Sequence, residues 1–426
     1  MTTGRGRRGQ EPSGHIEVLY GTVAGFDVHK ATIMVCVRRL QPDGRVLKEI
    51  RQVGTMTADL LELSDWLRAA GVTHVAMEST GVFWKPVYNL LEGQCTVLLV
   101  NAQHLKKVPG RKSDVSDAEW IAHCLQCGLL RASFVPERPQ RELRDLTRDR
   151  AVVAEERTRV ANRVHKVLED ANIKLAAVAT DILGVSGRAM LERLIAGEED
   201  SAVLAELARR RLRAKLPQLR QALQGRVTAH HRFLLRELLE HYDFLTQRLE
   251  RLSARIAEVL PPPFREAVHH LITMPGVQER SAQAIVAEIG CDMQRFASPG
   301  HLASWAGISP GNHESAGQRK GGQPAKGNRW LRRTLTEVAQ AAAHTKGTYV
   351  RAQFDRLAPR RGKKRAIGAL AHTQLTAAYH MLATGTDYHD LGADFFARLN
   401  PERLTRYYVK KLQALGHHVT LTSVAA

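Results

Sequence analysis

The stretch Gly25-Phe26-Asp27-Val28-His29-Lys30 ends an apolar run with a carboxylate, and three more acids lie at similar boundaries further along the chain. Glu78 follows another apolar run, and Asp114 and Asp117 lie in Lys112-Ser113-Asp114-Val115-Ser116-Asp117-Ala118, where a helical pattern begins. Carboxylate oxygens are the ligands that Mg²⁺ prefers in proteins. Four carboxylates from three elements therefore indicate a metal site.

The elements predicted around these acids are short strands and helices. Strand patterns span residues 19–28, 32–39, 45–53, 73–77 and 96–100, and helical patterns span 58–70 and 86–91. Pro42-Asp43-Gly44 predicts a hairpin turn between the second and third strands. This order is typical of an α/β domain with a mixed sheet, the plan of a ribonuclease-H-like domain. In that plan the first and fourth strands are neighbours, which brings Asp27 and Glu78 together.

Each acid also has an interpretation that needs no metal. Ser113 or Asp114 can cap the start of a helix, with Asp117 near the positive end of the helix dipole. Asp27 and Glu78 can be ordinary turn residues. Because Asp114 and Asp117 are three residues apart, they would share one helical face and could meet the strand-end acids. Only the joint pattern favours the metal site.

Composition points to a nucleic-acid partner. The chain has 426 residues, enough for two or three domains, and its 62 Lys and Arg residues against 43 Asp and Glu give a formal net charge of +19. Such an excess favours a polyanion. No apolar run approaches the ~18 residues that span a membrane, and the N-terminus lacks an apolar signal core, so we expect a cytoplasmic protein. The lone pair Cys124 and Cys127 is interpreted as helix packing rather than as a zinc or redox site.

The middle of the chain is predicted to be helical. Residues 1–14 should form a disordered basic arm, whereas 141–168 and 231–260 should be long helices. The second long helix carries an apolar seam that suits a partner helix, either in the same chain or in a second protomer. The seam consists of Leu234, Leu238, Tyr242, Leu245, Leu249, Leu252 and Ile256.

Three further features lie in and after this helical region. Six basic residues between 209 and 220 form a patch that binds phosphates or is simply a solvated helix face. Pro261-Pro262-Pro263 ends the region, since no helix continues through three prolines, and predicts a domain boundary. Beyond it, Met274-Pro275-Gly276-Val277 joins two helical patterns, as in a helix-hairpin-helix unit. Such a turn offers backbone N–H groups to a phosphate, and a plain helical hairpin is the alternative.

A segment rich in Gly and Pro spans residues 307–329 and is predicted to be a flexible loop without regular structure. It contains Ser315, and its C-terminal side is basic without an acid. The cations are Arg319, Lys320, Lys326, Arg329, Arg332 and Arg333. A loop serine usually only forms a turn, but cations around an exposed hydroxyl suit nucleophilic attack on a phosphodiester. Helices are predicted from Arg329 and at 367–382 with a basic run between them, and 395–421 should be a short helix ending in a strand-like segment.

These motifs together resemble the DEDD transposases of the IS110 insertion-sequence family. The acid motifs are similar to the acidic tetrad of that family. The similar C-terminal segments are Met274-Pro275-Gly276-Val277, Gly307-Ile308-Ser309-Pro310, Ser315 and Lys326-Gly327-Asn328-Arg329-Trp330-Leu331-Arg332. The resemblance extends over nearly the whole chain in the same order.

The resemblance implies three domains and two kinds of nucleic-acid partner. It implies a RuvC-like domain at 15–137, a coiled-coil region at 138–260, and a mostly α C-terminal transposase domain at 264–426 with a helix-hairpin-helix element. It also implies a structured noncoding guide (bridge) RNA that pairs with donor and target DNA. Members act as homo-oligomers, a dimer or a tetramer in the synaptic complex, whose protomers share active sites. Such a protein is prokaryotic and nucleoid-associated.

The resemblance also assigns residue roles. Asp27, Glu78, Asp114 and Asp117 would hold Mg²⁺, for which Mn²⁺ could substitute, and Ser315 would attack phosphorus and form a phosphoserine link. The expected nucleic-acid-binding residues are Arg319, Lys320, Lys326, Arg329, Arg332, Arg333, Pro275 and Gly276. Glu314 stands where a second serine is expected, which adds an acid near the scissile phosphate.

Three alternatives remain open. A RuvC-like endonuclease would use the same four acids with water as nucleophile, and a covalent protein–DNA adduct would distinguish the two. An actin-like or sugar-kinase ATPase would have glycines after Asp27, where this chain has Val28-His29-Lys30. An inactive remnant would bind DNA without cutting it.

Overall fold

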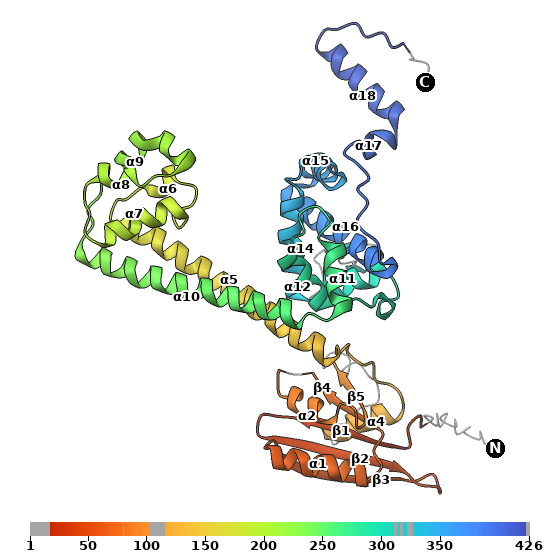
Figure 1. Ribbon diagram of the computed structural model, residues 1–426. Coiled ribbons are helices and arrows are strands. Elements are labelled where there is room, and N and C mark those ends of the chain that lie inside the picture. The colour runs from red at the N-terminus through yellow and green to blue at the C-terminus, as the bar shows by residue number, and fades with distance from the viewer. Residues whose placement is uncertain are drawn as a thin grey trace, which may run out of the picture. The chain divides into compact units, whose positions relative to one another are not determined.

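The computed structural model describes residues 18–79, 81–101, 116–310, 313–315, 318–321 and 327–422. The chain divides into two compact units, Met1–Val135 and Pro136–Ala426. The first unit contains a mixed β-sheet with helices, and the second unit is mostly helical (Figure 1). This broad division agrees with the predicted α/β domain followed by helical regions. The domain boundaries predicted at 137 and 260–264 stay predictions. Within the described residues, no helix is both long and apolar enough to span a membrane.

The sheet of the first unit has five strands in the order β3-β2-β1-β4-β5. They are β1 (Thr22–Val28), β2 (Thr32–Leu40), β3 (Val46–Gly54), β4 (His74–Glu78) and β5 (Thr96–Val100). β1, β2 and β3 pair antiparallel, whereas β4 lies parallel to both β1 and β5. The five predicted strands and the predicted contact between the first and fourth are therefore confirmed.

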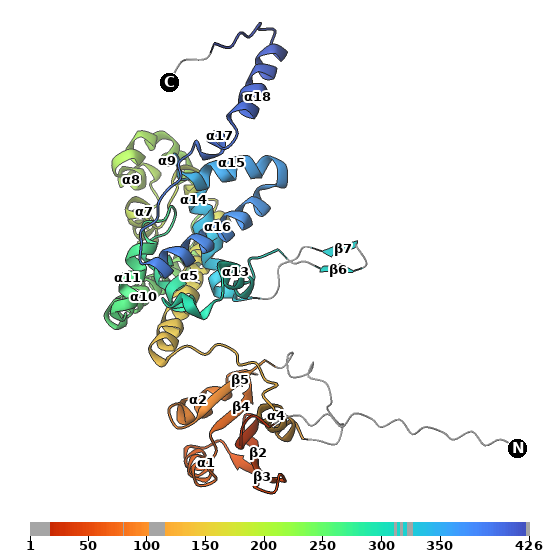
Figure 2. The ribbon, with the colours of Figure 1, turned by 90° about the vertical axis from the view of Figure 1, so that its right-hand side faces the viewer.

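Helices cover both faces of this sheet. Figure 2 shows α1 (Thr57–Ala69) and α2 (Trp84–Leu91) on one side and α4 (Asp117–Gln126) on the other. Because side chains alternate along a strand, Ala24 and Phe26 belong to the core under α1 and α2, whereas Val23 packs on the α4 side.

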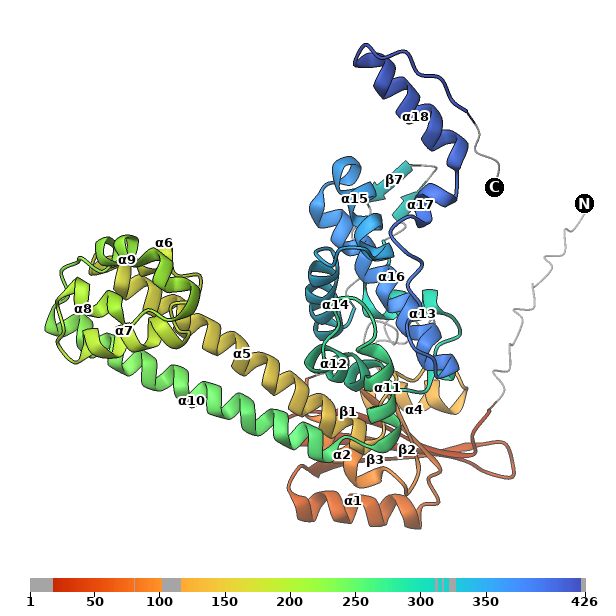
Figure 3. The same ribbon diagram turned by 45° about the horizontal axis from the view of Figure 1, so that its top comes forward.

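Two long helices dominate the first part of the second unit. α5 (Arg138–Asp170) and α10 (Ala229–Val259) pack along each other (Figure 3). Leu238, Leu245 and Leu249 of the predicted seam are buried in a cluster that also contains Val160 and Val164 of α5. The seam therefore packs within the chain. Short helices gather at one end of the pair (Figure 3): α6 (Leu175–Val178), α7 (Val185–Ile195), α8 (Ser201–Glu206), η1 (Arg210–Lys215) and α9 (Leu216–Ala222).

The remaining helices of the second unit form a separate core. They are α11 (Pro262–Leu271), α12 (Glu279–Ile289), η2 (Met293–Arg295), α13 (Pro299–Ala306), α14 (Arg329–Ala342), α15 (Tyr349–Arg361), α16 (Lys363–Thr384), α17 (Phe395–Arg398) and α18 (Pro401–Ala414). The buried face of α14, including Leu331, Leu335 and Val338, packs in this core with residues of α12 and α16. The helix predicted from Arg329 is thus confirmed, and its apolar face is buried.

Two sequence predictions in this part are wrong. The segment 307–329 contains a two-stranded antiparallel hairpin, β6 (His313–Ser315) and β7 (Gln318–Gly321), where no regular structure was expected. Only two residues separate the strands, and such a spacing with a glycine is a hairpin signal. The predicted strand-like segment near residue 421 is absent, because the described residues 416–422 form no strand and all of them except Val419 are exposed.

Candidate functional site

Asp27 and Glu78 lie at the ends of neighbouring parallel strands. Phe26 pairs with Met77 in the β1–β4 register, so the next residues, Asp27 and Glu78, stand at the same end of the sheet. Met77 shares the core under α1 and α2 with Phe26. By strand alternation, Asp27 and Glu78 belong to the opposite face, which α4 covers. Both side chains are half-buried.

Helix α4 brings a third acid toward this end. A Cβ atom at Gly25 would lie 2.3 Å from Ala118 O and 2.3 Å from Ala122 N, so α4 rests directly on β1. The carbonyl of Gln126 at the other end of α4 accepts a hydrogen bond from Leu19 N, 2.8 Å away, just before β1. α4 therefore runs antiparallel to β1, and Asp117 at its first position lies toward the end of β1 that carries Asp27.

The cap of α4 separates two interpretations of its first turn. Ser116 is the N-cap, and its hydroxyl accepts from Glu119 N at 3.3 Å, so neither Ser113 nor Asp114 caps this helix. Asp117 is exposed at the positive end of the helix dipole, where a carboxylate is stabilised without metal. Asp114 lies outside the described residues, so its role stays a prediction.

The acids that the structure describes have donor atoms that fit Mg²⁺, because carboxylate oxygens are its preferred protein ligands. Asp27 is 28% exposed, and its Oδ2 lies 3.1 Å from Nε2 of His29. Among the residues described, no group of three or more His, Cys, Asp or Glu side chains is close enough to hold an ion. The roles of Asp27, Glu78 and Asp117 as metal ligands, like that of Asp114, therefore stay a prediction.

Ser315 lies next to the turn of the β6–β7 hairpin, which projects from the helical part beyond α13 (Figure 2). Its backbone pairs with Gln318 and that of Glu314 with Arg319. Only residues 316 and 317 lie between the two strands in the sequence. This position at the tip of a projecting hairpin suits a residue that must reach a nucleic-acid strand, and the role of Ser315 as a nucleophile stays a prediction.

The two ends of the serine segment, defined as residues 307–328, are held together at their base. A Cβ atom at Gly327 would lie 2.3 Å from Gly307 N and 2.5 Å from Ala306 O. Gly307 itself is the C-cap of α13, with φ at 71°, in the left-handed region that favours glycine. The close approach of these two glycines fixes where the segment leaves and re-enters the helical core.

A buried polar network anchors the same base. The side chain of Asn328 caps α14 by accepting from Trp330 N and Leu331 N, at 3.0 and 3.1 Å. Its Nδ2 donates to Glu288 Oε2 at 2.6 Å. Glu288 is buried in α12 and receives two parallel hydrogen bonds from Arg148 of α5, at 2.7 and 2.8 Å. One carboxylate thus connects α5, α12 and the start of α14.

Arg144 completes this network from α5. Its Nε donates to Ala287 O at 2.8 Å, and its Nη2 donates to Glu288 O. Burial lowers the pKa of Arg144 to about 10, and the nearby Glu288 carboxylate opposes that shift. A buried guanidinium of this kind is stable only with its partner charge present, so the network is a structural support for the serine segment.

Sequence reasoning overlooked Arg144, Arg148 and Glu288, and gave Asn328 no role. A signal for Glu288 was present, because it is a single acid inside the apolar run Ala284-Ile285-Val286-Ala287-Glu288-Ile289. An acid in such a run must be paired when the helix is buried. The sequence does not show which arginine, more than a hundred residues away, supplies the partner.

The predicted nucleic-acid-binding residues differ in their availability. Arg333 pairs with Glu337 at 2.9 Å and with Glu155, so its charge is largely neutralised. Arg329 is exposed and stacks over the Trp330 ring at 4.7 Å, and Arg332 is exposed. Arg319 and Lys320 belong to β7, and Lys326 lies outside the described residues.

The Pro275-Gly276 turn packs against the core. Gly276 has φ at 80°, and a Cβ atom there would lie 2.6 Å from both Ala342 N and Val338 O of α14. The buried Gln374 donates to Pro275 O at 2.9 Å. These contacts favour the plain helical hairpin, and a phosphate contact at this turn stays a prediction.

The Cys124 thiol is buried on α4, and burial raises its pKa to about 12, so it remains protonated. Cys127 lies near His123, with 3.8 Å between Sγ and Nδ1. A protonated, buried thiol is inert, in agreement with the packing interpretation.

Comparisons with known proteins agree with the order of these features. Residues 24–173 match the family profile of the DEDD transposases of IS110, and residues 268–355 match that of the transposase IS116/IS110/IS902 family. The chain is 28% identical over 282 residues to a "Probable family 20 transposase" of Pseudomonas aeruginosa, which covers 66% of this chain and 74% of the relative. It is also 28% identical over 304 residues to the "Insertion element IS110 uncharacterized 43.6 kDa protein" of Streptomyces coelicolor, with 66% and 73% covered. The two profiles span the acids and the region around the serine segment, and the chain belongs to the IS110 family of transposases.

Proposed function

We propose that this transposase excises and inserts its element by cutting DNA with Ser315 as the nucleophile, and that its N-terminal unit is a RuvC-like domain. Transposases cleave and rejoin DNA, and the IS110 profile over residues 24–173 indicates dependence on a divalent metal in general. The observation that supports the specific site is the placement of Asp27 and Glu78 at neighbouring strand ends, with α4 directing Asp117 toward the same end.

The acids would act by holding a cation. When bound, Mg²⁺ supplies positive charge that offsets the charge developing on the scissile phosphate. Asp27, Glu78, Asp114 and Asp117 would provide oxygen ligands from separate elements, and the rigid contact at Gly25 fixes the position of α4 relative to β1. Carboxylates gathered at one site would favour binding of the cation, because like charges held together are unfavourable without it.

Ser315 would perform the substitution at phosphorus. Its Oγ forms a bond to phosphorus, the bond between phosphorus and the leaving DNA oxygen breaks, and the hydroxyl proton passes to solvent while the leaving oxygen is protonated. The phosphodiester energy is conserved in the phosphoserine link, so a second DNA hydroxyl can reverse the step without ATP. A hydroxyl is a weak nucleophile at neutral pH, so the reaction would need cations around the phosphate, and the exposed Arg329 and Arg332 are the proposed source.

The same proposal includes partners. The net charge of +19 suits both donor and target DNA and a structured guide RNA. We propose that the guide RNA pairs with the DNA. The described surface offers exposed cations, which suit the phosphate backbones of both nucleic acids. We further propose that the protein works as a homo-oligomer, and that the α5–α10 pair is its coiled-coil region.

Trapping the covalent intermediate tests the serine. Wild-type protein with Mg²⁺ and element-end DNA should yield an adduct that survives denaturation, and Ser315→Ala should abolish both adduct and cleavage. Asp27→Asn should abolish both equally while DNA binding persists, because binding rests on the basic surface. Ser309→Ala, in the same segment, is the matched control and should react normally. Cleavage by Ser315→Ala at the wild-type position and rate would instead establish a water-using endonuclease.

A further inference from the structure

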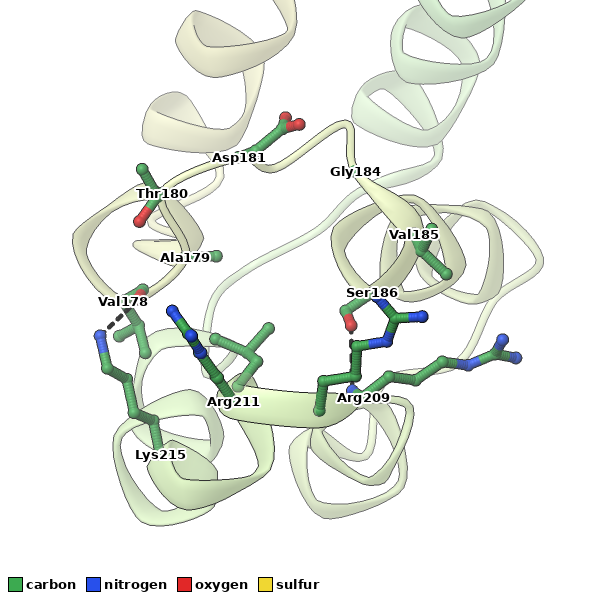
Figure 4. Close-up of a pocket in the computed structure, with 12 residues that line it drawn as sticks. Val178, Ala179, Thr180, Asp181, Gly184, Val185, Ser186, Arg209, Arg211 and Lys215 are labelled. Atoms are coloured by element: carbon green, nitrogen blue, oxygen red, sulfur yellow. Dashed lines mark hydrogen bonds between the residues drawn. The ribbon is translucent and has the colours of Figure 1, made fainter.

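A cavity of about 710 Å³ lies among the short helices at the end of the α5–α10 pair, and none of its lining residues is assigned to strand transfer above (Figure 4). One wall comes from the segment 178–186 and the other from 209–215. Its volume is within the ~300–1,000 Å³ that is usual for small-ligand sites. The cavity is therefore large enough for more than a single inorganic anion.

The second wall carries positive charge that the protein does not neutralise. Arg209, Arg210 and Arg211 follow one another, all are exposed, and within the described part of the chain none forms an ion pair. Arg213 and Arg220 nearby differ, since both pair with Glu206, at 3.2 and 3.3 Å. Concentrated positive charge in a concave site attracts anions.

Polar groups from α7 face the same space. The Ser186 hydroxyl oxygen accepts from Arg209 N at 3.0 Å, which leaves its hydrogen available to a ligand. α7 begins at Val185 after Gly184, and no side chain caps it, so the N–H groups of its first turn are unsatisfied donors of the kind that bind phosphate. The one acid in the lining, Asp181, accepts from Leu183 N at 2.9 Å, and Figure 4 shows its carboxylate turned away from the labelled arginines.

The backbone at Arg210 is strained. Its φ is 51°, in the left-handed region that favours glycine. Residues held in such conformations cluster at ligand-binding sites, where the surroundings maintain them. Glycine would adopt this conformation more easily than arginine does. The presence of Arg210 at this position is therefore consistent with a role for its positive charge.

The lining also includes the apolar side chains of Val178, Val185 and Leu212. Thr180 and Lys215 lie beside them, and Lys215 Nζ donates to Val178 O at 3.2 Å. We propose that the pocket binds one unpaired nucleotide of a nucleic-acid strand, with its phosphate on Arg209, Arg211 and the start of α7 and its base against these apolar side chains. A base inside a duplex cannot enter a cavity, whereas unpaired bases are bound by extrusion onto such surfaces. The inference rests on the proposed nucleic-acid partners but not on the strand-transfer chemistry.

Short probes test the pocket, because a dinucleotide cannot bridge to other basic surfaces. Calorimetric titration of the full-length protein, without divalent metal, with 5′-phosphorylated pUpU and pTpT measures the affinity. The double variant Arg209→Gln, Arg211→Gln should weaken binding by about tenfold, since two charge-assisted contacts are lost. The control Arg213→Gln, Arg220→Gln removes the same charge and should stay within about twofold. Equal weakening by both pairs, or by neither, would overturn the proposal.

Two further variants separate binding from folding and from catalysis. Arg210→Gly removes a charge but relieves the backbone, so it should weaken binding while leaving the Tm unchanged or raised. Asp27→Asn should bind the dinucleotides like wild type. The proposal about the acid site and the proposal about the pocket can therefore be rejected independently. Tighter binding of pUpU assigns the pocket to RNA, and tighter binding of pTpT assigns it to DNA. Inorganic phosphate that binds as tightly as either dinucleotide would overturn the role of the base.

Discussion

Asn328 anchors the base of the serine segment through both ends of its side-chain amide. It caps α14 through its Oδ1 and donates to the buried Glu288 carboxylate through its Nδ2. A loss of the cap alone costs about 1 kcal/mol, and leaving Glu288 short of a donor adds about 1–2 kcal/mol. We therefore expect Asn328→Ala to lower the free energy of unfolding by about 2–3 kcal/mol, measured by chemical denaturation.

A matched cap elsewhere isolates the Glu288 contribution. Thr348 caps α15 by accepting from Arg351 N at 3.2 Å, and it has no contact with the Glu288 network. Thr348→Ala should cost only about 1 kcal/mol. If the two variants were destabilised equally, the hydrogen bond from Asn328 to Glu288 would contribute nothing.

The packing of α4 on β1 is the contact between elements on which the proposed acid site depends. A Cβ atom at Gly25 would lie 2.3 Å from backbone atoms of Ala118 and Ala122, and backbone cannot rotate away as a side chain can. Gly25→Ala should therefore displace α4, lower the free energy of unfolding by about 3 kcal/mol and abolish Mg²⁺-dependent cleavage.

Gly21 provides the control for this contact. It precedes β1, has ordinary backbone geometry, and a Cβ atom there would meet no atom within 4 Å. Gly21→Ala should leave both stability and cleavage near wild type. A Gly25→Ala protein that retained wild-type cleavage would show that the position of Asp117 on α4 is unimportant for the reaction.

Elements with a clear apolar period were predictable and those without one were not. The five strands of the sheet and the long helices α5 and α10 each have a buried face that repeats with the period of the structure. α15 was not predicted, since Val350 is its one fully buried residue and Pro359 lies inside it. The β6–β7 hairpin was overlooked because its short polar strands have no apolar alternation.

The candidate site was likewise only partly predictable from the sequence. Strand order brought Asp27 and Glu78 together, because neighbouring parallel strands end at one edge of the sheet. The network of Arg148, Glu288 and Asn328 joins three helices far apart in the sequence, and residue types alone carry no information on such pairing. The cavity beside η1 was visible only as a basic patch, since its concavity depends on the packing of α6, α7 and η1.

At the scale of the whole molecule, positive charge is abundant but only part of it is free to bind phosphate. Many arginines on α5 and α10 pair with acids, such as Arg138 with Glu142 at 3.0 Å and Arg255 with Glu258 at 2.9 Å. The junction between α15 and α16 differs. Its exposed residues are Arg360, Arg361, Lys363, Lys364 and Arg365, and within the described residues none of them forms an ion pair.

This junction should therefore contribute directly to nucleic-acid affinity. Each phosphate contact releases counterions and adds about 0.9 to the slope of log K against log salt for duplex DNA. Arg360→Gln, Arg361→Gln, Lys363→Gln should reduce that slope by about 2–3, measured by fluorescence anisotropy across a salt series. The control Arg138→Gln, Arg159→Gln, Arg255→Gln removes equal charge from residues that are already ion-paired, so its slope should change by less than about 1. If both triple variants flattened the slope equally, net charge rather than this exposed junction would determine binding.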